Sequence, residues 1–439
     1  MKSFLKWALL LTGFMPLVYS SGSLFPYIFP KGLYFRGLIF VAVVVFCITC
    51  AAKKNFRDEM IAKISSVWKN SVFKWMTFFY GALLLSTIFA FDRYMALFGN
   101  IEREEGFVGL FFFYIFFVLI TILFEKKDWL RFFVVNMLAG LVLFLVEASQ
   151  FFLQNNARPG SLTDNPIFLA TYLIFVIFSA VMVYRAANKK NNTLVMSASM
   201  VSIIISLVGI FMTQTRGALL GMFFGLIVVF IYFGIASKNI IVYKNISLRR
   251  LVVYCMVVGA VFVAIFVSTR HSSVWAHIPG LNRVALISTN DPTTQARFVN
   301  AGIAVHAVDP REVGITRSFF GWGWDNYIYA WQKFYNPRLF SFDQSLFDRA
   351  HDKLLDVLLM SGILGIITYL GLWFVFFREA FKKGKEFSLE IAMFVFWGIA
   401  FFLQNLTVFD TLVTFITFYA IFAYLIYETR ENTNTTITK

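Results

Sequence analysis

The sequence is short of charge and of the residues that usually build reactive centres in soluble proteins. Of its 439 residues only 14% are charged, whereas 59% are hydrophobic and 19% are aromatic. A soluble globular domain is usually about 25% charged and about 45–50% apolar. The low charge therefore excludes an ordinary soluble domain and points to a membrane protein.

The three cysteines and four histidines do not predict a disulfide framework or a metal centre. All the cysteines lie inside apolar runs, where Cys47 and Cys50 are expected to pack between helices although their spacing resembles a redox pair. The histidines do not follow the ligand spacing of a dedicated zinc site. The sequence also lacks a glycine-rich phosphate-binding motif. A group transfer outside the cytoplasm would therefore need a donor that is already activated.

Long apolar runs dominate the rest of the sequence. A run of about 20 apolar residues predicts a helix that crosses a bilayer. We expect twelve such helices, at about 4–22, 34–52, 73–91, 107–124, 130–152, 166–184, 194–212, 216–236, 250–268, 354–377, 388–408 and 411–428. The predicted fold is an all-α polytopic membrane protein with about twelve transmembrane helices.

The net charge of +15 indicates topology. If the N-terminus is cytoplasmic, each short inward loop carries more lysine and arginine than the outward loops beside it, as cytoplasmic loops do. We therefore expect both termini in the cytoplasm and no nucleic-acid partner. The chain then divides into nine helices (1–268), one large extracytoplasmic loop (269–353), three more helices (354–428) and a cytoplasmic tail (429–439).

Arg216 is a candidate ligand for an anion on the outer side. Residues 213–221 join two predicted spans with almost no loop, and Thr215 is a plausible N-cap for the second span. Arg216 would then lie in the first helical turn, where unpaired backbone N–H groups and the helix dipole add to its charge. Such a site suits a phosphate of a lipid carrier. The alternative is an arginine that snorkels at a helix end.

The glycines after Arg216 predict close helix packing. Gly217, Gly221 and Gly225 repeat every four residues along the same span. Small residues at this spacing let the backbone of a neighbouring helix approach closely.

The long loop carries a second candidate arginine and two tryptophans. Asp291 and Pro292 predict a capped helix that begins there and ends before Pro310. On a surface helix Arg297 could meet a lipid headgroup, although it could equally be solvated. The aromatic rings in the 321–327 segment, Trp322 and Trp324, suit stacking on sugar rings, but they suit an interfacial belt equally well.

His351 is the candidate for proton transfer. The unperturbed pKa of histidine lies near 6.5, about where a general base works at physiological pH. Either Asp348 or Asp352 could orient one ring nitrogen, and the three-residue spacing would place Asp348 and His351 on one helical face. The alternative is a structural histidine at the mouth of a helix.

Taken in order, these stretches resemble the bacterial O-antigen ligase superfamily, which includes O-antigen polymerases and some protein O-oligosaccharyltransferases. The matching stretches are 98–107, 157–166, 213–221, 295–298, 320–327 and 347–365. The resemblance implies a multi-pass glycosyltransferase of the bacterial inner membrane. It also implies a glycan donor carried by undecaprenyl diphosphate, an acceptor in a lipid core, a glycan or a protein, and no metal or other cofactor.

The resemblance also implies roles for individual residues. Arg216 and Arg297 would hold the diphosphate and stabilise its charge as it leaves. His351 would act as the base for the acceptor hydroxyl in a transfer that inverts the anomeric centre. Asp352 departs from the family, which commonly has asparagine there. Further candidate substrate contacts are Arg103, Arg158, Asp348, Asp352, Trp322 and Trp324.

Several functions stay open. Within the superfamily we favour ligation because the chain has one large outward loop, but polymerisation and protein glycosylation remain alternatives. A polysaccharide or lipid transporter without catalysis is a further alternative. Transporters usually carry their polar sites near mid-membrane, whereas the candidate acids here, Glu147 and Asp410, are expected near the outer edge. A purely structural role in the cell envelope would not explain Arg216, Arg297 and His351.

Overall fold

The computed structural model describes residues 1–236, 241–243, 246–382 and 388–437. Contacts between Cα atoms divide the chain into two compact units. The first unit comprises Met1–Ala139, Thr289–Phe376 and Asn405–Lys439, and the second comprises Gly140–Ser288 and Phe377–Gln404. Three helices contribute residues to both units, and each unit is described by itself below.

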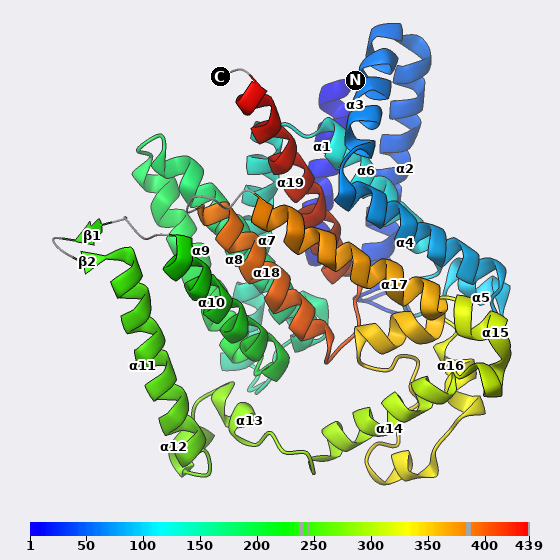
Figure 1. The fold of residues 1–439 in the computed structure, drawn as a ribbon, viewed down its shortest axis with the longest axis vertical. Coiled ribbons are helices and arrows are strands. Elements are labelled where there is room, and N and C mark those ends of the chain that lie inside the picture. Colours follow the sequence, from blue (N-terminus) through cyan, green and yellow to red (C-terminus); the bar gives the residue numbers. More distant parts are fainter. Residues whose placement is uncertain (237–240, 244–245, 383–387, 438–439) are drawn as a thin grey trace. The chain divides into compact units, whose positions relative to one another are not determined.

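The first unit is built from helices taken from three parts of the sequence (Figure 1). Its N-terminal part contains α1 (Lys2–Leu11), the 3-10 helix η1 (Thr12–Leu17), α2 (Phe29–Ala52), α3 (Lys54–Trp68), α4 (Ser71–Ile88), α5 (Arg93–Phe98), α6 (Phe107–Leu123) and the first half of α7 (Lys126–Phe152). Its later parts contain α14 (Pro292–His306), α15 (Pro310–Phe320), α16 (Tyr327–Lys333), η3 (Pro337–Ser341), most of α17 (Lys353–Lys382) and α19 (Leu412–Ile437).

The second unit is also mainly helical. It contains the rest of α7, η2 (Ser161–Thr163), α8 (Pro166–Asn188), α9 (Thr193–Met212), α10 (Arg216–Ala236), α11 (Leu248–Thr269), α12 (Ser273–Ala276), α13 (Leu281–Ala285), the end of α17 and almost all of α18 (Leu389–Asn405). A short antiparallel pair, β1 (Ile241–Tyr243) and β2 (Ile246–Ser247), precedes α11.

The described part of the chain confirms a polytopic membrane protein. Nine of its helices are long and apolar enough to cross a membrane, namely α2, α4, α7, α8, α9, α10, α11, α17 and α19. Two shorter apolar helices, α6 and α18, have 17 residues each and lie where the sequence predicts spans. The total of twelve transmembrane helices stays a prediction.

The predicted span at 4–22 is not one continuous α-helix. The helix α1 has ten residues and ends at Leu11, and the chain continues as a 3-10 helix that contains Pro16. Proline lacks a backbone N–H and its ring clashes with the preceding turn, so it does not extend an α-helix. Ten residues are too few for a helix to cross a bilayer, which needs about 20.

Aromatic side chains form the centre of the first unit, where α19 packs against α6 and α4. The hydroxyl groups of Tyr80 and Tyr419 lie 2.6 Å apart, and both residues are buried. Phe113 stacks on Tyr419 with ring centroids 5.7 Å apart, and Phe35 stacks on Phe113 at 4.2 Å. Paired rings add to the free energy gained by burial. They join helices from the beginning and the end of the sequence.

Of the three glycines that repeat every four residues in α10, two, Gly221 and Gly225, have the role that their spacing predicts. A Cβ atom on Gly221 would lie 2.6 Å from the carbonyl oxygen of Ala400 in α18. A Cβ atom on Gly225 would lie 2.9 Å from the carbonyl oxygen of Phe396. Only glycine permits this close approach, so the second unit depends on both positions.

A kink in α17 holds the tryptophan-rich turn in place. Gly362 has a φ of 66°, which interrupts the helix and changes the hydrogen bonding of the preceding turn. The backbone N–H of Trp322 donates to the carbonyl of Leu359 at 3.0 Å, and that of Gly323 donates to Met360 at 2.9 Å. The turn is therefore fixed to the same helix that follows His351.

Candidate functional site

His351 lies just before α17, which begins at Lys353. Its φ of 56° is outside the helical region. The prediction that Asp348 and His351 share a helical face is therefore wrong, because the residues between them are not helical. The ring of His351 meets Phe347 at 5.5 Å and Phe409 at 5.1 Å between centroids, in edge-to-face geometry. The imidazole is half-buried between these two rings.

The main chain sets the protonation of His351. Its Nδ1 atom lies 3.2 Å from the carbonyl oxygen of Arg349. A carbonyl only accepts, so Nδ1 carries the proton and Nε2 keeps its lone pair in the neutral ring. Burial lowers the pKa of His351 below its ordinary value, and the charges of Arg297 and Arg103 act in the same direction. The arrangement keeps the imidazole neutral near pH 7 and able to accept a proton.

Asp348 does not orient the imidazole because it pairs with Arg103. The Nη2 atom of Arg103 donates to Oδ1 of Asp348 at 2.9 Å, and its Nε donates to Oδ2. Burial raises the pKa of Asp348, but the hydrogen bonds from Arg103 and the charges of Arg349 and Arg103 outweigh it, so the net shift is downward. The guanidinium of Arg103 also lies 4.3 Å from the centroid of Phe409. Phe409 therefore contacts both Arg103 and His351.

Arg297 lies on the helix that the sequence predicts. The helix α14 begins at Pro292, and the carboxylate of Asp291 accepts from the N–H of Thr294 at 3.2 Å as its N-cap. The Nη2 atom of Arg297 donates to the carbonyl of Thr407 at 3.0 Å. Since Thr407 and Phe409 belong to the same connection between α18 and α19, this connection links Arg297 to the surroundings of His351.

Asp352 caps the N-terminus of α17. Its Oδ1 atom accepts from the backbone N–H groups of Leu354 at 2.9 Å and Leu355 at 3.2 Å. These bonds satisfy donors that the first turn of a helix leaves without intrahelical partners. Burial raises the pKa of Asp352 above its usual value despite these bonds and the charge of Arg297. Asp352 thus fixes the direction in which the chain enters α17 immediately after His351.

Sequence reasoning missed the buried role of Arg349. Only 2% of its side chain is exposed, and its Nη2 atom lies 2.5 Å from Asp325 and 3.2 Å from Glu105. Burial lowers the pKa of Arg349, but the charges of the two carboxylates outweigh burial and raise it overall. The carbonyl oxygen of Arg349 also accepts the hydrogen bond from Nδ1 of His351. The sequence signal for this role was a charged residue two positions before the candidate base His351.

The two predicted tryptophans are both buried. Trp322 donates from its indole N–H to the carbonyl of Ala307 at 2.8 Å. Its ring also lines a hollow of about 460 Å³ that contains Arg317 and Lys333. The ring of Trp324 lies 5.1 Å from the ammonium of Lys353. Their part in sugar binding stays a prediction.

The second unit gathers three arginines. Arg216 is the first residue of α10, as predicted, and the hydroxyl of Thr215 donates to the carbonyl of Pro166 at 3.4 Å. Arg158 donates from Nε to the carbonyl of Thr213 at 3.4 Å. Burial, and then the charges of Arg283 and Arg216, lower the pKa of Arg158 to about 10. Mutual repulsion of this kind marks cations that are close together.

Arg283 is the member of this cluster that the sequence did not reveal. It lies on the short helix α13, next to Asn282, whose amide donates to Gln214 at 3.3 Å. The amide of Gln214 in turn donates to the carbonyl of Ala157 at 2.8 Å. These bonds join the segments that carry Arg283, Arg216 and Arg158. Three guanidinium groups together favour a ligand with several negative charges, such as a diphosphate.

The first unit thus has a polar cluster around a neutral histidine, and the second unit has a cluster of arginines. Residues 201–370 match the family model described as O-antigen ligase, so this part of the chain is similar to that family. Its members are glycosyltransferase-like membrane enzymes, either ligases or polymerases. The match includes Arg216, Arg297 and His351. No curated protein matches the chain.

Proposed function

We propose that this protein is an inverting glycosyltransferase of the bacterial inner membrane. It moves a glycan from undecaprenyl diphosphate to an acceptor hydroxyl on the outer side, in the biosynthesis of cell-surface polysaccharide such as lipopolysaccharide O-antigen. The observation that carries the proposal is the setting of His351. Its Nδ1 faces a carbonyl, and burial keeps the ring neutral, so Nε2 is ready to accept a proton.

The arginines would bind the diphosphate of the donor and stabilise it as it leaves. Arg158, Arg216 and Arg283 favour an anionic ligand, and Arg297 adds a cation in the first unit. In the proposed step the acceptor oxygen bonds to the anomeric carbon while its proton passes to Nε2 of His351. The bond from that carbon to the diphosphate oxygen breaks, and the arginines stabilise the leaving diphosphate. A single in-line displacement inverts the anomeric centre without a covalent enzyme intermediate or a metal.

The topology belongs to the same proposal. Twelve spans with both termini in the cytoplasm put the loop 269–353 on the outer side, and the distribution of lysine and arginine supports this orientation. The donor would then reach the site already flipped and activated. We favour a lipid core as acceptor, with a growing glycan or a protein as the alternatives.

Transfer by the purified protein in nanodiscs tests this function. The protein would receive undecaprenyl-diphosphate oligosaccharide together with lipid-core, glycan or peptide acceptors. Loss of a general base typically costs about 10²–10⁴-fold in rate, so we expect His351→Ala to lose transfer to this extent. Arg216→Ala and Arg297→Ala should lose transfer by weaker donor stabilisation. The exposed residue Arg311 provides the control Arg311→Ala, which should transfer normally.

The outcomes separate the candidate functions. A new glycosidic product that forms with only one class of acceptor would name the acceptor. Catalysis would be contradicted if no acceptor gave a product and if the folded variants bound the donor as well as the wild type does. Movement of the lipid-linked glycan across a vesicle membrane without transfer would instead establish a transporter.

A further inference from the structure

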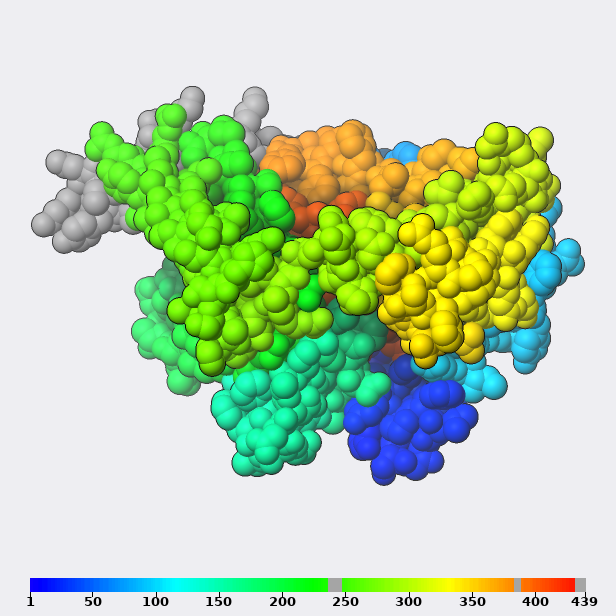
Figure 2. All heavy atoms as spheres, turned by 90° about the horizontal axis from the view of Figure 1, so that it is seen from below, coloured from blue at the N-terminus to red at the C-terminus, as the bar shows by residue number. Residues whose placement is uncertain are grey.

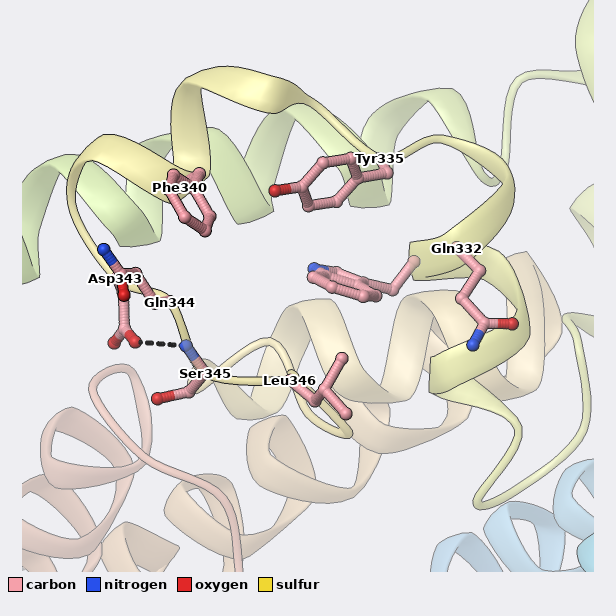
Figure 3. A pocket seen from close by; sticks show the side chains of 8 residues that line it. Gln332, Tyr335, Phe340, Asp343, Gln344, Ser345 and Leu346 are labelled. Atoms are coloured by element: carbon pink, nitrogen blue, oxygen red, sulfur yellow. Dashed lines mark hydrogen bonds between the residues drawn. The ribbon is translucent and has the colours of Figure 1, made fainter.

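The first unit has a hollow of about 430 Å³ whose lining does not include His351. It lies between α16 and the segment around η3, on the surface formed by residues from α14 to 346, drawn in yellow-green and yellow in Figure 2. Figure 3 shows Tyr335 and Phe340 along one side of the space, Leu346 on the opposite side, and Asp343 and Gln344 at one end. The remaining lining residues are Trp331, Gln332 and Ser345.

Local contacts hold the walls of this hollow in place. The carboxylate of Asp343 accepts from the backbone N–H of Ser345 at 2.9 Å, which fixes the turn at one end. Leu339 of η3 is buried and anchors the segment that carries Phe340. The ring of Trp331 packs edge-to-face against Tyr335, with centroids 5.0 Å apart. Contacts within the protein therefore orient these aromatic surfaces.

Two features of the hollow call for a ligand with both polar and apolar surfaces. Trp331 is only 6% exposed, and within the described part of the chain its indole N–H has no hydrogen-bond partner. A buried donor without a partner costs free energy, so it favours a ligand that offers an acceptor. Phe340 and Leu346 are 60% and 79% exposed. An apolar ligand face would cover them.

We propose that this hollow binds one sugar ring of the glycan substrate, an inference that rests on the glycosyl transfer proposed above. A pyranose has an apolar C–H face that packs on aromatic rings, and its hydroxyls reach planar amides and carboxylates at the edge. Gln332, Gln344 and Asp343 supply such groups beside the rings of Trp331 and Tyr335. The volume lies within the usual range of about 300–1,000 Å³ for small-molecule sites.

The charge of the lining defines the class of sugar. Asp343 is the charged residue of this hollow, and its carboxylate would repel a phosphate or a uronic acid. A neutral sugar or an amino sugar fits, because its hydroxyl, amide or ammonium groups can donate to the carboxylate. The ring could come from the donor glycan or from the acceptor.

Insertion into lipid is a poorer explanation for the exposed side chains. An acyl chain has no acceptor for the N–H of Trp331 and nothing to pair with Asp343. Anionic headgroups would also repel a carboxylate at the membrane surface. The polar groups therefore favour a sugar over a lipid.

Saturation-transfer NMR on the full-length protein in nanodiscs tests the site directly. The probes are the methyl glycosides of glucose, galactose, N-acetylglucosamine and glucosamine, with methyl glucuronide as the acidic comparison. We expect transfer to the ring protons of at least one neutral or amino glycoside. Trp331→Phe keeps an aromatic ring but removes the N–H, and we expect it to weaken binding by at least about fivefold. Phe340→Ala should weaken binding to a similar extent.

A matched pair of apolar residues provides the control. Leu346 lines the hollow and Ile315 does not, yet their exposures are 79% and 80%. Leu346→Ala should weaken glycoside binding, and Ile315→Ala should leave it unchanged. Equal binding by Trp331→Phe, Phe340→Ala and the wild type would overturn the proposal, as would a complete lack of glycoside binding.

Steady-state kinetics of glycosyl transfer show whether the bound sugar belongs to the donor or to the acceptor. They also test this sugar site separately from the proposed transferase activity. A higher KM of Phe340→Ala for the acceptor alone assigns the ring to the acceptor, and a higher KM for the donor alone assigns it to the donor. Normal KM values for both substrates would count against the site while leaving the transferase intact. Glycoside binding that depends on Trp331 in a protein without transfer would keep the site and reject the transferase.

A spin label tests lipid insertion. In a chain whose native cysteines are replaced by serine, a nitroxide on Leu346→Cys would be relaxed by lipid-dissolved oxygen if this segment enters the bilayer. Such relaxation, unchanged by any of the glycosides, would overturn the proposal. Relaxation by a water-soluble reagent that falls when a glycoside is added would support it.

Discussion

Arg103 donates from Nη2 to Oδ1 of Asp348 over 2.9 Å, joining two residues that lie 245 positions apart. Both were candidate substrate contacts, and the structure shows that they also bind each other. The pair holds the guanidinium of Arg103 against the ring of Phe409, which in turn contacts His351. The ion pair therefore helps to hold the ring of Phe409 beside His351.

The coupling between Arg103 and Asp348 is measurable with a double-mutant cycle. Charge-assisted hydrogen bonds in a partly buried pair contribute about 1–2 kcal/mol to stability. We expect Asp348→Asn and Arg103→Gln each to lower the free energy of unfolding, and the double variant to lose less than the sum. Denaturant or thermal unfolding in detergent micelles provides the measurement. Strictly additive losses would show that the two side chains act independently.

The lowered pKa of His351 predicts the pH dependence of the reaction. A base works only when unprotonated, so kcat/KM should fall as the pH drops through the pKa of His351 in the folded protein. That pKa lies below the ordinary value of about 6.5. The rate should therefore still exceed half its maximum at pH 6.5. An acidic limb with a midpoint above about 6.5 would contradict this setting.

The same shift predicts a loss of stability in acid. The folded protein holds His351 neutral at pH values where the unfolded chain would already protonate it. Between the pKa values of the two states, the unfolded form binds more protons, so stability falls as the pH decreases below about 6.5. His351→Gln should flatten this part of the stability profile. An unchanged slope in that variant would assign the dependence to other groups.

Arg297 should influence His351 through its charge. Because the charge of Arg297 lowers the pKa of His351, Arg297→Gln should raise it. Diethyl pyrocarbonate reacts with neutral imidazole, so its rate at His351 against pH reports the pKa without requiring activity. Peptide mapping distinguishes His351 from the other histidines, and Arg311→Ala serves as the control. An identical titration in both variants would count against the electrostatic contact.

Arg349 should be essential to the fold of the first unit. Arg349→Met removes the cation that lies beside two buried carboxylates, Asp325 and Glu105. Breaking a buried ion pair from one side typically costs about 3–5 kcal/mol. We expect a much lower unfolding temperature for Arg349→Met, a smaller loss for Arg349→Lys, and none for the exposed control Arg311→Ala. The melting curves of the three purified variants decide between these outcomes.

Arg283 should contribute to donor binding in the second unit. If it helps to hold a diphosphate, Arg283→Ala should raise KM for the lipid-linked donor by roughly 10- to 100-fold, the loss expected for one charge-assisted bond. KM for the acceptor should stay the same. A change confined to the acceptor would show that the arginine cluster has another ligand.

The second unit offers a matched pair of glycines. A Cβ atom on Gly221 would lie 2.6 Å from the backbone of α18, whereas one on Gly259 of α11 meets no atom within 4 Å. Gly221→Ala should therefore destabilise the protein by about 1–3 kcal/mol through overpacking. Gly259→Ala should cause no loss. Equal melting temperatures for the two variants would contradict the close packing of α10 against α18.

The sequence by itself determined the features that depend on local chemistry. Hydrophobic runs marked the membrane helices, because a spanning helix pairs its own backbone polar groups and needs apolar side chains toward the lipid. Asp291 and Pro292 marked the start of α14, because caps act over a few residues, and α10 begins at Arg216 as predicted. These signals need no knowledge of what lies elsewhere in the chain.

Only the tertiary structure decided how the candidate residues are used. It paired Asp348 with Arg103, gave His351 a carbonyl instead of a carboxylate, and buried Arg349 between two acids. It also brought Arg283 to the other arginines of the second unit. Side-chain contacts between residues far apart in the sequence depend on which helices pack together, and neither periodicity nor spacing shows which side chains then meet.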